Sequence, residues 1–79
     1  MFIEIVFVGL PIDREEVEEA LEAAFDSDGE ITGAGSGTGR CHLDLEIEPS
    51  LERDAALERL RSVLAGLGVE ECATLSVGD

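Results

Sequence analysis

Strict alternation of apolar and polar residues after residue 40 is the feature that most constrains the fold. The apolar set, which we expect to face inward, is Cys41, Leu43, Leu45 and Ile47. The polar set, which we expect to face outward, is His42, Asp44, Glu46 and Glu48. Successive side chains of a strand point to opposite faces, so this stretch predicts a strand with one buried and one exposed face. Such strands are typical of antiparallel sheets that are covered on one side only.

A second strand is predicted over Phe2–Val8, where both parities are apolar except at Glu4. A strand that is apolar on both faces usually lies in the centre of its sheet. The Gly9-Leu10-Pro11 segment predicts a turn after it.

Two amphipathic helices are predicted from apolar residues at helical spacing. Asp13 and Glu16 predict an N-cap and capping box for the first helix, and Ser50 predicts the N-cap of the second. Their apolar stripes are Val17, Ala20, Leu21, Ala24 and Phe25 in the first, and Leu57, Leu60, Leu64 and Leu67 in the second.

The remaining segments complete a β-α-β-β-α-β order. We expect a short strand over residues 30–32, a glycine-rich loop over residues 33–39, and a final strand over residues 69–77. This order predicts a single α+β domain over residues 1–79 with a ferredoxin-like fold, in which two helices lie on one face of a four-stranded antiparallel sheet. The first and third strands would be central, and the second would be the shortest.

The formal net charge of −14 restricts the classes of partner. All five basic residues are arginines. Such a field repels nucleic acid and anionic membranes and attracts basic partners, although solubility or adaptation to a saline cytoplasm also explains it. The two cysteines do not make a disulfide framework, and we recognise neither a signal peptide nor a membrane span, so we expect a bacterial or archaeal cytoplasmic protein.

The glycine-rich loop does not match a nucleotide-binding motif. Thr38 stands where G-x-G-x-x-G requires glycine, the chain has no lysine for a phosphate loop, and a strand rather than a helix follows. We expect a flexible hairpin connection, with contact to a ligand or partner as the alternative. The candidate contact residues are Gly35, Ser36, Gly37, Thr38 and Arg40.

The outward parity of the alternating strand is the second candidate site. Glu4 should project from the neighbouring strand on the same side, so the candidate partner face is Glu4, His42, Asp44, Glu46 and Glu48. A carboxylate row of this kind suits a basic protein surface, while an ordinary solvated face is the alternative. We expect no metal site and no cofactor, because one histidine among carboxylates on a flat face lacks an enclosing geometry.

No catalytic set is recognised, and we expect a protein that is not an enzyme. Cys41 and His42 are adjacent and therefore point to opposite faces of their strand. Cys72 is expected on the far edge strand, away from His42.

The first 31 residues resemble an RNA recognition motif. Val6-Phe7-Val8-Gly9-Leu10-Pro11 is similar to that family's first signature strand, and the Glu-rich helix and Gly29-Glu30-Ile31 continue the likeness. The resemblance implies RNA binding through aromatic rings. The second signature position reads Thr38-Gly39-Arg40-Cys41-His42-Leu43, without either aromatic residue. We therefore expect shared fold rather than shared function; a ligand-binding domain of this kind would need Phe7 exposed.

A looser resemblance covers nearly the whole chain. GAGSGTG followed by Leu43-Asp44-Leu45-Glu46 is similar to small acidic bacterial proteins of ferredoxin-like fold, some of which are immunity proteins against toxins. The leading hypothesis is a non-catalytic module that binds a basic protein, of the immunity or inhibitor type. A self-associating regulatory domain, dimerising through the uncharged final strand, is a further alternative.

Overall fold

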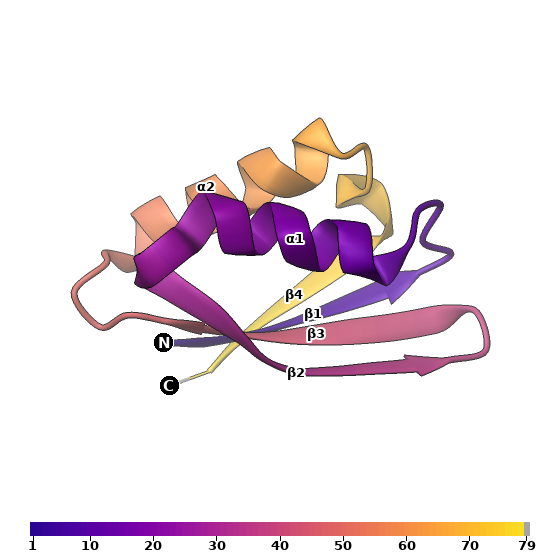
Figure 1. Cartoon of the computed structure of the whole chain (residues 1–79), viewed down its shortest axis with the longest axis horizontal. Helices are drawn as coiled ribbons and strands as arrows, with labels where there is room; N and C mark the ends of the chain where they lie inside the picture. Colours follow the sequence, from indigo (N-terminus) through magenta and orange to yellow (C-terminus); the bar gives the residue numbers. More distant parts are fainter. Residues whose placement is uncertain (79) are drawn as a thin grey trace.

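The computed structural model describes residues 1–78 and has eight elements in chain order (Figure 1). They are β1 (Phe2–Val8), α1 (Arg14–Phe25), the 3₁₀ turn η1 (Asp26–Asp28), β2 (Gly29–Gly37), β3 (Arg40–Ile47), α2 (Arg53–Gly66), the 3₁₀ turn η2 (Glu70–Cys72) and β4 (Ala73–Gly78).

The strands form one antiparallel sheet in the order β2-β3-β1-β4, and both helices lie on the same side of it (Figure 1). The predicted ferredoxin-like βαββαβ architecture is therefore confirmed, with the first and third strands in the centre. No helix within residues 1–78 has the length and apolar character needed to cross a membrane.

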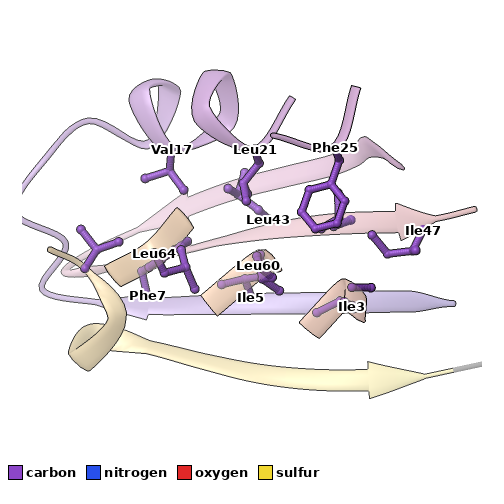
Figure 2. Packing of buried hydrophobic residues seen from close by; sticks show 13 residues of the cluster. Ile3, Ile5, Phe7, Val17, Leu21, Phe25, Leu43, Ile47, Leu60 and Leu64 are labelled. Atoms are coloured by element: carbon purple, nitrogen blue, oxygen red, sulfur yellow. The ribbon is translucent and has the colours of Figure 1, made fainter. Parts of the chain in front are cut away.

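The core lies between the sheet and the helices and is almost entirely aliphatic. Its two aromatic members are Phe7 and Phe25, which are 0% and 1% exposed. Figure 2 shows side chains from α1, α2, β1 and β3 meeting in one cluster. The sheet supplies Ile3, Ile5, Phe7, Leu43, Leu45 and Ile47; the helices supply Val17, Leu21, Phe25, Ala56, Leu60 and Leu64; and Val69, between α2 and η2, completes the cluster.

β2 differs most from the prediction. It runs from Gly29 to Gly37 and is the longest strand, so the expected short strand and the loop expected from residue 33 are both wrong. Only Thr38 and Gly39 remain as the hairpin turn, with Gly39 at φ +68°. Glycine disfavours strands intrinsically, but here the ladder to β3 continues as far as the pair of Gly37 with Arg40.

The ends of both helices also correct the predictions. Asp13 is the N-cap of α1, but its side chain makes no capping hydrogen bond, and only its backbone carbonyl accepts a bond from the Glu16 N–H. α2 begins at Arg53 with Glu52 as N-cap, not at Ser50. A turn explains the delay, because the Leu51 N–H donates to the Glu48 carbonyl and keeps the intervening residues outside the helix.

The final strand begins later than predicted. Val69 is buried in the core and η2 follows, so β4 starts at Ala73 and Cys72 lies in η2 rather than on the edge strand. The inward parity of β4 is as expected, since Leu75 pairs with Ile5 and Val77 with Ile3. Val77 is nevertheless 38% exposed, as suits a strand with a neighbour on one side only.

Candidate functional site

The face of the sheet opposite the helices is the candidate site, called here the open face. Residues that pair across antiparallel strands point to the same side, so the register defines its rows. From β2 through β3 to β1 and β4 the rows are Gly35, His42, Val6 and Thr74; then Gly33, Asp44, Glu4 and Ser76; then Glu30, Glu46, Phe2 and Gly78. Arg40 and Val8 pair beyond the first of these rows, at the hairpin end.

Three predicted site residues meet in the middle of the open face. Glu4 of β1 lies directly across from Asp44 of β3, and His42 lies two residues earlier on β3. Donor atoms of these three side chains all lie within 4.8 Å of one another. Within it, His42 Nε2 and Asp44 Oδ2 lie 3.8 Å apart. We call Glu4, His42 and Asp44 the central cluster.

Two glycines of β2 make room for this cluster. A Cβ atom at Gly35 would stand 2.5 Å from Cε1 of His42, and one at Gly33 would stand 2.6 Å from Oδ2 of Asp44. Both distances are shorter than side chains tolerate, so His42 and Asp44 lean over backbone that carries no side chain. The glycine-rich segment thus supports the polar row of β3 instead of forming a loop.

A β-bulge sets this arrangement. The register shifts between Ile31 and Gly33, which leaves Thr32 without a Cα partner in β3. An unshifted ladder would place Thr32 opposite Asp44 and Ala34 opposite His42. The extra residue therefore brings glycines, rather than larger residues, to the two positions where the side chains of β3 need space.

The remaining predicted face residues lie at one end of the sheet. Glu46 pairs with Glu30, which was not among the predicted site residues. Glu48 lies past the end of β3, and its N–H donates to the Asp28 carbonyl. Glu30, Glu46 and Glu48 line a hollow of about 410 Å³ together with Asp26. We call these four residues the acidic end.

The predicted loop residues lie at the opposite end of the sheet and do not share one face. The hydroxyl of Ser36 is turned away from the open face and accepts a hydrogen bond from Arg14 Nη1. Gly35, Gly37 and Arg40 line a hollow of about 340 Å³ beside His42, to which Ser36 also contributes although its hydroxyl is bonded to Arg14 on the other side. Thr38 sits in the exposed hairpin turn. The structure therefore places only part of this set beside the central cluster.

The cysteine of β3 does not belong to the open face. Cys41 pairs with Phe7 and Ser36 and is partly buried on the helix side, opposite in parity to His42. Burial raises the pKa of the Cys41 thiol, while the Arg14 charge opposes this shift and Cys72 adds to it. A protonated thiol is a weak nucleophile, so Cys41 lacks the setting of an activated cysteine.

No protein-family model matches this chain. No curated protein matches it either. Function must therefore be argued from the site itself. Of that site, the sequence indicated the carboxylates and the histidine, but not Glu30, the roles of Gly33 and Gly35, or the bulge that aligns them. The glycine run was the available signal, because glycines beside a polar strand also suit close approach of side chains.

Proposed function

We propose that this chain is a non-catalytic protein-binding module whose open face docks on a basic protein surface. The observation that carries the proposal is the uncovered sheet: both helices lie on one side, and the other side presents acidic and apolar side chains together. An immunity or inhibitor protein is the form of such a module that we favour, because it acts by covering a surface rather than by chemistry.

The charge of the open face supports a basic partner. Its carboxylates are Glu4, Glu30, Asp44 and Glu46, and its one arginine is Arg40 at the hairpin end. Among the described residues, the ion pairs to arginine involve Glu18 and Asp28, and neither lies on this face. In the part of the chain that the structure describes, no carboxylate of the open face is therefore paired with an arginine, and the acidic end offers a hollow of about 410 Å³ for an incoming lysine or arginine side chain.

Apolar side chains on the same face supply contact area. Phe2 and Val6 are partly buried and Val8 is 53% exposed, all three on β1. Apolar groups rimmed by charges are typical of interaction surfaces. Two copies of this face would bring like charges together, so the charge favours a basic partner over self-association through the open face.

RNA binding has weaker support. The resemblance to the RNA recognition motif required an exposed Phe7, yet Phe7 is 0% exposed in the core. The open face retains Phe2 as its aromatic residue, amid carboxylates that repel phosphates.

The test compares two double variants with the same change in charge. Glu30→Lys with Glu46→Lys alters the acidic end, and Glu19→Lys with Glu22→Lys alters exposed positions of α1. Each variant and the native protein are immobilised, exposed to lysate at low salt and eluted with rising salt. We expect the native and α1-variant columns to retain one basic protein and the acidic-end column to lose it. The affinities of the three proteins for the purified partner should follow the same order.

Three outcomes would contradict the proposal. Equal loss from both variant columns would mean diffuse attraction to a charged chain rather than docking on the open face. Nucleic acid in the eluate would favour the RNA-binding alternative. A native column that retains nothing, with a protein that is dimeric by light scattering, would favour self-association.

A further inference from the structure

The central cluster has the composition of a metal site. Glu4, His42 and Asp44 each offer one donor atom, and these atoms lie within 4.8 Å of one another. We propose that the central cluster binds a divalent first-row transition ion of the Zn²⁺ type. This site goes beyond the proposed docking function, and it reverses the expectation from sequence that no metal site is present.

The donor set selects the class of ion. Imidazole nitrogen and carboxylate oxygen are ordinary ligands of Zn²⁺, at about 2.0–2.2 Å. Mg²⁺ and Ca²⁺ prefer oxygen alone, and soft ions prefer the thiolates that this face lacks. Two carboxylates also balance the charge of a divalent ion. Ligands of one such ion lie up to about 4 Å apart, so small side-chain rotations are enough to close the cluster.

The glycines of β2 determine where the two ligands of β3 lie. Gly33 and Gly35 leave room for Asp44 and His42 at the two positions where a Cβ would collide with them, so both side chains lie close to the backbone of β2. The bulge at Thr32 is what aligns both glycines. The ligands also come from β1 and β3, the two central strands, whose pairing holds their backbones in a fixed register.

The ring orientation assigns the coordinating nitrogen. The Cε1–Nδ1 side of the His42 ring lies over Gly35, where a Cβ would approach these atoms to 2.5 and 3.0 Å. Nε2 is farther from that position and lies 3.8 Å from Asp44 Oδ2. Nε2 is therefore the atom that faces the Asp44 carboxylate. Three protein ligands leave further coordination positions for water on the solvent side.

A titration of the isolated protein tests the site. His42 is the one histidine of the chain, so its ring nitrogens report on a single position in ¹⁵N-detected NMR. We expect ZnCl₂ to shift the Nε2 resonance until one ion per chain is bound, and a roughly hundredfold excess of MgCl₂ not to reverse the shift. Glu4→Gln should lower the Zn²⁺ affinity by at least about tenfold, whereas Glu22→Gln, an equal change of charge on α1, should leave it unchanged.

Several results would overturn the site. An unshifted His42 ring, reversal by MgCl₂, or an equal loss of affinity in Glu4→Gln and Glu22→Gln would show that ions associate only with the acidic surface in general. The outcome is separable from the docking proposal. The titration needs no partner, and the Glu30→Lys and Glu46→Lys variant that should lose its partner keeps all three ligands and should still show the Nε2 shift.

Discussion

Gly35 lies directly across the β2–β3 ladder from His42, and a Cβ at Gly35 would stand 2.5 Å from the His42 ring. The chain thus has glycine at the position where the ring of its one histidine lies over the neighbouring strand. The same relationship repeats one step along the ladder between Gly33 and Asp44. These two contacts connect a glycine-rich segment with no recognisable motif to the most polar part of the open face.

Gly35→Ala should displace the His42 ring while leaving the fold intact. The colliding atoms belong to a partly exposed side chain that can rotate away, so we expect a change in the stability of less than about 1 kcal/mol. The ring resonances of His42 should move even without metal. Gly37→Ala is the matched control, because its Cβ would come no closer than 3.9 Å to the Arg40 carbonyl. Identical His42 spectra in the two variants would contradict the close approach of the His42 ring to Gly35.

Phe7→Ala should strongly destabilise the protein. The Phe7 side chain is fully buried in the core, and its truncation leaves a cavity that costs about 3–5 kcal/mol. In a domain of this size that is a large part of the total stability. Val8→Ala, at the next and 53% exposed position, is the control and should cost well under half as much. Urea unfolding of both variants measures the difference, and similar midpoints would argue against a buried Phe7.

Arg59→Ala should weaken the contact between the two helices. The guanidinium of Arg59 on α2 donates to Asp28 Oδ2 at 3.0 Å and to the Ala24 carbonyl at 3.4 Å, and it lies 5.3 Å from the centroid of the Phe25 ring. Partly exposed contacts of this kind are worth about 1 kcal/mol together. Arg61→Ala removes the same charge from α2. Within residues 1–78 the ion pairs of arginine involve Arg14 and Arg59, so this variant should have a smaller effect on thermal unfolding. If both variants lower the unfolding temperature equally, Arg59 contributes only its charge and not these specific contacts.

Added salt should stabilise the protein. The net charge of −14 makes the folded chain repel itself, and added ions screen this repulsion. We therefore expect the unfolding midpoint in urea to rise between about 10 and 200 mM NaCl. A fall over this range would mean that attractive ion pairs, such as that of Arg59 with Asp28, outweigh the repulsion.

Cys41 should contribute a loss of stability at alkaline pH. Burial raises the pKa of its thiol in the folded state, so the folded chain holds this proton at pH values where the unfolded chain has released it. The stabilising contribution is therefore complete below the unfolded pKa and declines as pH rises through the interval up to the folded pKa. Cys41→Ala should show a shallower decline of the unfolding free energy above about pH 8.5 than the native protein. If the unfolding free energies of the two proteins decline in parallel as pH rises, Cys41 does not cause the loss of stability.

The sequence predicted those helices and strands in which the apolar residues recur with the period of the element and are buried in the fold. The alternation from Cys41 and the apolar run of β1 identified the two central strands, and the helical stripes identified both helices. Each pattern follows from the period of its own element, 2 for strands and 3.6 for helices. The predicted ends of the elements were wrong where contacts within the fold determine the boundary. The turn between Glu48 and Leu51, for example, moves the start of α2 beyond Ser50.

For the candidate site, the sequence was enough to predict which chemical groups share a face: His42 and Asp44 follow from strand parity, and Glu4 follows from the expected pairing of the two central strands. The fold was needed to show that residues 33–37 are a strand, that a bulge at Thr32 sets their register, and that two glycines lie beneath the polar side chains of β3. These features could not be predicted because glycine has no side chain whose pattern could reveal a buried or exposed face. Its conformation is therefore set by the neighbouring strand, which supplies the hydrogen bonds and the side chains that fill its space.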